Sequence, residues 1–224
     1  MFNYKAWVDR AIQFTERIQN LKPFFDEITI VSTLQPPLTD SEIIEVKSKA
    51  EKYIPLELIN FWTTGSANLN CHYYLSNPKT ERLSQINEIF GLQSSIYGGA
   101  SFLIANELPD KLLDLKEWAE ETWIVEYPNE QKFWLNSVPF FEMQNGDCLA
   151  LDVAEEKDDP RVIYLSHDDE SSVISESFTN FLTNWERLYY IGPEGWLLDI
   201  FQNESGFICS DSDEAEKLRN IFSL

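Results

Sequence analysis

The spacing of apolar side chains predicts that the chain begins with a helix. Between residues 4 and 22, apolar residues recur at intervals of four and three, as on one face of an amphipathic helix. These residues are Trp7, Ala11, Phe14, Ile18 and Leu21. Pro23 predicts the end of this helix because proline interrupts helical hydrogen bonding. A connector with a β-rich centre at 28–31 follows and ends at Pro36-Pro37.

A capping signature marks the start of the next helix. Thr39 is followed three residues later by Glu42, so each side chain can satisfy the other's free backbone N–H. The apolar face of this helix is predicted to consist of Ile43, Val46, Ala50 and Tyr53. Pro55 suits the first position of a second short helix, from Leu56 to Thr63, and Gly65 suits its C-terminal cap.

The chain between residues 66 and 121 carries weaker signals. They predict a short strand at 71–74, a helical turn at 84–90, a flexible break at Tyr97-Gly98-Gly99 and a helix at 109–121.

Short β-prone runs dominate the next part of the chain. They predict strands at 123–126, 133–135, 139–143, 147–153 and 161–165. Asn145-Gly146 predicts a type I′ hairpin turn between two of them. One closing helix is predicted to be capped by Ser177, and another to begin at Ser212. The order indicates an α+β fold class with N-terminal helices, a central antiparallel or mixed β-sheet meander, and closing helices.

The charge balance narrows the choice of partners. The chain has 38 acidic and 17 basic residues, for a formal net charge of −21. Such a surface repels nucleic acid and anionic lipid, whose binding depends on Lys and Arg. It attracts basic partners and speeds their encounter, although acidity also serves solubility alone. We therefore expect no nucleic-acid and no membrane partner.

The cysteines and the apolar runs indicate the compartment. Cys71, Cys148 and Cys209 are an odd number without a Cys-x-x-Cys pair, which favours reduced, buried thiols. No apolar run approaches the ~20 residues that cross a bilayer, and the first residues lack a signal-peptide pattern. These features predict a cytoplasmic protein.

The residues that could carry chemistry are few. His167 is followed by Asp168 and Asp169, but one histidine without further His or Cys at ligand spacing is a weak metal signal. Asp147 and Asp152 are five residues apart on one predicted strand, so they point to opposite faces of the sheet. No phosphate-binding, dinucleotide-binding or nucleophile-elbow motif is present. We therefore expect no catalytic residue, no cofactor and no metal site.

Three segments, taken in order along the chain, match the motifs of one known family. The first covers residues 38–43 with 54–62 and is similar to an opening helix followed by an Ile-Pro helix entry. The second, 145–152, resembles a Gly-Asp-hydrophobic-Leu-Asp strand. The third, 161–169 with 177–182, is similar to a Val-Tyr-x-x-x-His-Asp strand and a Ser-Phe-x-x-Phe-Leu closing helix. Together they resemble the SUKH superfamily, the family of the fungal Smi–Knr cell-wall-assembly regulators and their bacterial relatives.

A chain of 224 residues is short for two domains, so we expect a single domain over residues 1–224. An N-terminal helix and connector (1–37) would precede the SUKH-like core (38–188), and a C-terminal extension (189–224) would pack on that core. The expected core contains Ile43, Val46, Tyr53, Leu58, Phe61, Leu149, Leu151, Val162, Tyr164, Phe178, Phe181 and Leu182.

The resemblance also implies a non-catalytic binding module. Bacterial members are implied to be immunity proteins that bind and block toxins, and the acidic charge fits a basic, nuclease-type toxin. The alternative is a scaffold or regulator of cell-wall or signalling assembly, like the fungal members. Acidic turns are the expected contact surface because recognition residues commonly lie on loops. They form one group of Glu155, Glu156, Asp158 and Asp159, and a second of Asp168, Asp169 and Glu170.

Overall fold

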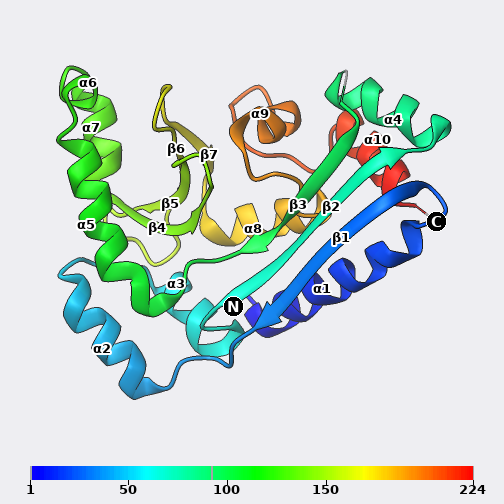
Figure 1. Cartoon of the computed structure of the whole chain (residues 1–224). Helices are drawn as coiled ribbons and strands as arrows, with labels where there is room; N and C mark the ends of the chain where they lie inside the picture. Colours follow the sequence, from blue (N-terminus) through cyan, green and yellow to red (C-terminus); the bar gives the residue numbers. More distant parts are fainter. Residues whose placement is uncertain (1, 92, 224) are drawn as a thin grey trace. The chain divides into compact units, whose positions relative to one another are not determined.

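Two antiparallel sheets organise the computed structural model, which describes residues 2–91 and 93–223 (Figure 1). The first sheet consists of β1 (Phe25–Leu34), β2 (Leu69–Pro78) and β3 (Ser95–Ser101). The second consists of β4 (Ser137–Glu142), β5 (Cys148–Asp152), β6 (Val162–Leu165) and β7 (Ser172–Ser175). In both sheets the strands pair in chain order, so each sheet is a meander.

Helices occupy most of the remaining chain. The α-helices are α1 (Tyr4–Arg17), α2 (Asp40–Ala50), α3 (Leu56–Asn60), α4 (Thr80–Phe90), α5 (Leu108–Ala119), α6 (Thr122–Val125), α7 (Pro128–Leu135), α8 (Phe178–Arg187), α9 (Gly195–Leu198) and α10 (Asp213–Phe222). Short 3-10 helices span Ile18–Leu21, Ala105–Glu107 and Asp199–Phe201, and a π-helix spans Phe61–Gly65. The predicted α+β class is confirmed.

The described chain divides into two compact units. The first takes Gln35–Asn68 and Phe102–Phe181, together with the residues before Ala6. The second takes Ala6–Leu34, Leu69–Ser101 and the chain from Leu182 onward. The expectation of a single domain over the whole chain stays a prediction.

In the first unit, side chains cover both faces of the second sheet. Helices α5, α6 and α7 pack on one face through a cluster of Leu115, Ala119, Ile124, Trp134, Cys148, Ala150, Ile163 and Leu165. Side chains alternate along a strand, so Leu149 and Leu151 point to the other face. Near them the Phe140 ring lies 5.0 Å from that of Phe178 and 6.0 Å from that of Phe181.

In the second unit, two glycines allow close backbone contact on β3. Gly99 donates its N–H to the carbonyl of Tyr190 at 2.7 Å, and a Cβ at Gly98 would lie 2.3 Å from that carbonyl oxygen. The flexible break predicted at Tyr97-Gly98-Gly99 is therefore wrong. These glycines belong to a strand, and their missing side chains make room for the neighbouring backbone.

The strands predicted at 123–126 and 133–135 are also wrong, because both segments are helical. In α6, the N–H of Val125 donates to the carbonyl of Glu121, and Ile124 is buried in the cluster with α5. Helix α7 begins at Pro128, where a missing N–H costs nothing, and its Trp134 indole bonds Glu130 one turn earlier. Local β-propensity gave the wrong structure because helical packing on the sheet decides these segments.

Several boundaries also differ from the prediction. Residues 28–31 and 71–74 are the centres of two ten-residue strands, β1 and β2, and β7 was not predicted. The β4–β5 hairpin is present, but its turn is not type I′: Gly146 has a φ of 98°, whereas Asn145 does not have the positive φ that this turn type requires. The Thr39–Glu42 capping box, the cap at Ser177 and a helix beginning at Ser212 are confirmed, and Ser212 is the N-cap of that helix.

Most of the expected core is buried. Tyr53 is the exception: it lies beyond the end of α2 and is half-buried. The other members of that set are buried, and Phe181 is fully so. No helix in the described ranges is long and apolar enough to cross a membrane.

Candidate partner-binding surface

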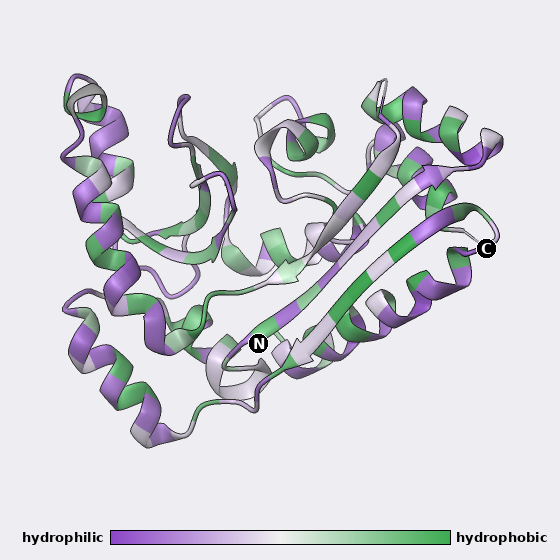
Figure 2. Ribbon diagram, viewed as in Figure 1, coloured by the Kyte–Doolittle hydropathy of each residue, from purple (hydrophilic) through white to green (hydrophobic). Residues whose placement is uncertain are grey.

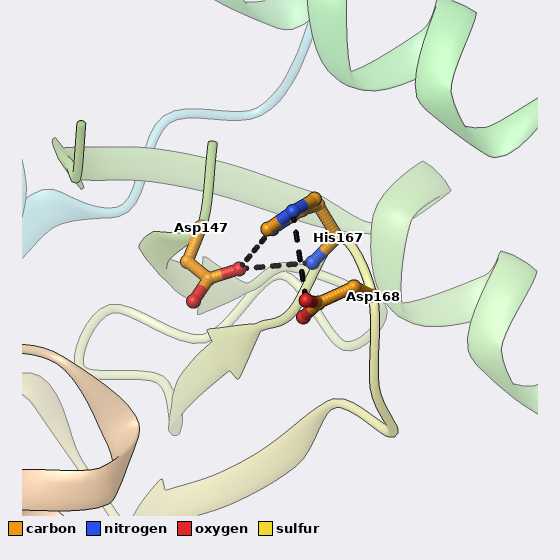
Figure 3. A group of neighbouring side chains, drawn as sticks. All are labelled: Asp147, His167 and Asp168. Atoms are coloured by element: carbon orange, nitrogen blue, oxygen red, sulfur yellow. Dashed lines mark hydrogen bonds and ion pairs between the residues drawn. The ribbon is translucent and has the colours of Figure 1, made fainter. Parts of the chain in front are cut away.

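Asp147 joins the turn before β5 to the loop after β6 (Figure 3). Its Oδ1 accepts the backbone N–H of His167 at 3.0 Å and lies 2.8 Å from Nδ1 of the same ring. Its Oδ2 accepts the Tyr164 hydroxyl and the Asn145 amide, the latter at 2.7 Å. The carboxylate is therefore buried and accepts hydrogen bonds on both oxygens.

These bonds set the charge state of Asp147. Burial raises its pKa, but the hydrogen bonds from Tyr164, His167 and Asn145 lower it by more, so the pKa lies below its ordinary value. Asp147 is thus held as a carboxylate. Because a carboxylate accepts hydrogen bonds and does not donate them, Nδ1 of His167 is the donor in this contact.

Asp147, His167 and Asp168 also carry side-chain atoms of the kinds that ligate metal ions. One ligand atom from each of Asp147, His167 and Asp168 lies within 4.8 Å of the others. A cation at this point would have to displace donors that already bond Asp147, and Asp168 is exposed and lies 3.8 Å from Nε2 of His167. The donor set therefore fits a structural link between two loops better than it fits an ion. The turn is exposed at Asp168, as predicted, whereas His167 is half-buried.

Asp152, the other carboxylate that could act in acid–base chemistry, has a separate partner. Asp152 ends β5 and forms an ion pair with Arg161, which directly precedes β6, at the loop that joins these strands. Its Oδ1 accepts the backbone N–H of Ala154. Asp147 and Asp152 thus belong to opposite ends of β5 and face no common substrate position.

A small cavity beside α5 contains a cysteine but no activated nucleophile. It has a volume of about 260 Å³, and its lining includes Trp118, Cys148 and Lys111. Burial raises the pKa of the Cys148 thiol, which keeps it protonated and weakly nucleophilic. Lys111 is held by Asp114 and Glu142. This cavity therefore supports no covalent mechanism.

The first predicted acidic group lies on the loop between β5 and β6, and much of it is engaged within the chain. Asp159 accepts the backbone N–H and the hydroxyl of Thr179, which fixes it to the first turn of α8. Asp158 accepts the Tyr53 hydroxyl. Glu155 forms an exposed ion pair with Lys157 at 2.6 Å. Three of these four acidic side chains thus have internal partners.

The second predicted acidic group lies on the loop after β6, at the opposite end of the hairpin, as expected (Figures 1 and 2). Asp168, Asp169 and Glu170 are all exposed. Asp169 and Glu170 line a cavity of about 490 Å³ together with Tyr127, Pro128 and Phe133 of the α7 region. The two acidic groups therefore form separate surfaces, and the second adjoins an aromatic wall.

The sequence prediction missed the residues on the α7 side of this cavity. Glu130 is buried, and its carboxylate accepts the backbone N–H and hydroxyl of Ser171 and the Trp134 indole. Tyr127 is 60 % exposed. The sequence Pro128-Asn129-Glu130 could have predicted the start of α7, because proline at the first helical position and an acid in the first turn are typical of a helix start.

Comparison with known proteins identifies the family of this chain. No curated protein matches the chain closely enough to count as a relative. The model of the SMI1 / KNR4 family (SUKH-1) matches residues 37–184, which is more than half of the chain and includes the second sheet and most of α8. Members of this family generally act through protein–protein interaction and without catalysis. The chain belongs to the SMI1 / KNR4 family (SUKH-1).

Proposed function

We propose that this chain is a cytoplasmic immunity protein that binds a basic, nuclease-type toxin domain and blocks it without catalysis. The observation that carries the proposal is the set of exposed carboxylates at both ends of the β5–β6 hairpin in a chain of net charge −21. Carboxylates held on a folded surface imitate the polyanionic substrate of a nuclease. They attract the basic nuclease over a distance of about 10 Å at 0.1 M salt.

Family membership and site chemistry support this function. The family acts through protein binding. Within the described chain, the candidate chemical groups have structural roles: Asp147 and His167 bond each other, Asp152 pairs with Arg161, and Cys148 is a buried thiol. A binding protein needs no further machinery.

Co-expression provides the test. The toxin domain encoded beside the gene for this chain is expressed in a sensitive cell with and without the chain. We expect growth to be restored, and the purified chain to bind the purified toxin domain in a one-to-one complex that abolishes its activity. Absence of a toxin gene beside this one, or growth arrest that the chain does not relieve, would contradict the proposal.

A further inference from the structure

The cavity between α7 and the loop after β6 combines an aromatic wall with two exposed carboxylates, Asp169 and Glu170, and the buried carboxylate of Glu130. We call it the Tyr127 cavity and define it by Tyr127, Pro128, Phe133, Asp169 and Glu170. Its volume of about 490 Å³ lies in the range of small-ligand sites, roughly 300–1,000 Å³. Tyr127 is 60 % exposed, so its side chain is accessible to a partner at the mouth of this cavity.

The two walls of this cavity are held in place by one buried carboxylate. Glu130 of α7 accepts the N–H of Ser171 at 3.1 Å, the Ser171 hydroxyl, and the Trp134 indole N–H at 3.1 Å. Since Ser171 directly follows Glu170, these bonds fix the acidic loop against the helix. A partner therefore meets a preformed site, and little free energy is lost in ordering it.

The charge of the cavity specifies what it can receive. No lysine or arginine is among its lining residues. Asp169 and Glu170 are exposed, and within the described ranges no hydrogen bond or ion pair engages the Glu170 carboxylate. An unbalanced carboxylate pair beside an aromatic face suits a guanidinium group, which can stack on the ring and bond carboxylates along its edge.

We infer that the Tyr127 cavity receives an arginine side chain of the bound partner. Its guanidinium stacks on Tyr127 and pairs with Asp169 and Glu170, and its aliphatic stem lies along Pro128 and Phe133. The inference rests on the proposed function only in identifying the partner as a basic toxin. Tyrosine and arginine are enriched among the residues that dominate binding energy at interfaces.

A small-molecule probe tests the site without any toxin. The ¹⁵N-labelled chain is titrated with N-acetyl-arginine methylamide and, as a neutral control of the same shape, with N-acetyl-citrulline methylamide. We expect saturable amide shifts at 127–133 and 169–171 with the arginine derivative and none with the citrulline derivative. Equal effects from both compounds, shifts spread over every acidic loop, or no saturable shift would overturn the inference.

Variants test the same site in the complex. We expect Tyr127→Ala, and separately Asp169→Asn with Glu170→Gln, to weaken toxin binding about tenfold or more, mainly through faster dissociation. Tyr74→Ala removes a tyrosine that is 43 % exposed on β2, and serves as the matched control. Asp26→Asn with Glu204→Gln makes the same charge change at exposed positions elsewhere.

The outcomes separate the two proposals. If the unmodified chain fails to bind the toxin, the proposed function falls, and the arginine titration still decides whether the cavity binds guanidinium. If the unmodified chain binds but the cavity variants behave like their controls, the function stands and the inference is wrong. Circular dichroism of each variant excludes unfolding as the cause of weaker binding.

Discussion

Nδ1 of His167 lies 2.8 Å from Oδ1 of Asp147, and the backbone N–H of the same histidine donates to that oxygen. Asp147 precedes β5 and His167 follows β6, so this pair closes one end of the hairpin. Tyr164 and Asn145 complete the set of donors to the carboxylate. Asp147 therefore accepts hydrogen bonds from three residues at once.

Replacing Asp147 should destabilise the fold. Asp147→Ala leaves the Tyr164 hydroxyl and the His167 N–H without their acceptor, and we expect a loss of about 2–4 kcal/mol in the free energy of unfolding. Urea denaturation at pH 7 measures it. Asp168→Ala removes an exposed neighbouring carboxylate and should change stability by less than about 0.5 kcal/mol. Equal effects from the two variants would show that Asp147 does not hold the hairpin.

The same carboxylate predicts a pH dependence. Because the pKa of Asp147 is lower in the folded chain than in the unfolded one, its contribution to stability is complete above the unfolded pKa, about 4. It is lost as the pH falls through the folded pKa. The stability difference between the unmodified chain and Asp147→Asn should therefore shrink below about pH 4. A difference that stays constant from pH 7 to pH 3 would contradict the assigned charge state.

The side chains of His167 and Asp152 should be dispensable for toxin binding. Because neither His167 nor Asp152 is assigned a chemical role, His167→Ala and Asp152→Ala should leave toxin neutralisation intact, apart from any effect on stability. Neutralisation assays paired with melting temperatures check this. Loss of protection at an unchanged melting temperature would reopen the possibility of a metal or active site.

The aromatic packing of the first unit gives a further prediction. Phe181 is fully buried and its ring lies 6.0 Å from that of Phe140. Phe181→Ala should cost ~3–5 kcal/mol, as for other truncations of core phenylalanines. Ile44→Ala, at a position on α2 that is 65 % exposed, is the control and should be nearly neutral. A loss below about 1 kcal/mol for Phe181→Ala would show that this residue does not belong to the core.

Capping and periodic signals in the sequence predicted helices α1, α2, α5, α8 and α10. Thr39 and Glu42 form the expected reciprocal bonds, and Ser212 accepts the N–H of Ala215 at the start of α10. Such features depend on residues within one turn of each other. The β5–β6 pairing was also predictable, because each strand is a short apolar run with a polar turn between them.

The failures lie where distant contacts decide the local structure. Gly98 and Gly99 are read as a break from local sequence, yet their role depends on the backbone of Tyr190. The region of α6 and α7 is β-prone in isolation and becomes helical when Ile124 and Trp134 pack with α5 on the sheet. The Tyr127 cavity was missed for the same reason, since its walls come together only through Glu130 and Ser171.

The exposed acidic side chains should speed the encounter of this chain with a basic toxin. Neutralising Glu155, Glu156, Asp158 and Asp159 together should therefore lower the association rate. Asp159 also accepts two hydrogen bonds from Thr179 in the first turn of α8, so its replacement would disturb the fold as well as the charge. The variant that changes charge with the least structural effect is therefore Glu155→Gln with Glu156→Gln. Its charge change should slow association and leave dissociation nearly unchanged, because it acts before contact.

Stopped-flow mixing of the chain with the toxin domain across a salt series measures this directly. We expect the association rate to fall steeply as salt rises, to fall less steeply for the Glu155→Gln/Glu156→Gln variant, and dissociation to change little. An association rate that is insensitive to both salt and these substitutions would contradict the electrostatic account and leave shape and apolar contacts to carry recognition.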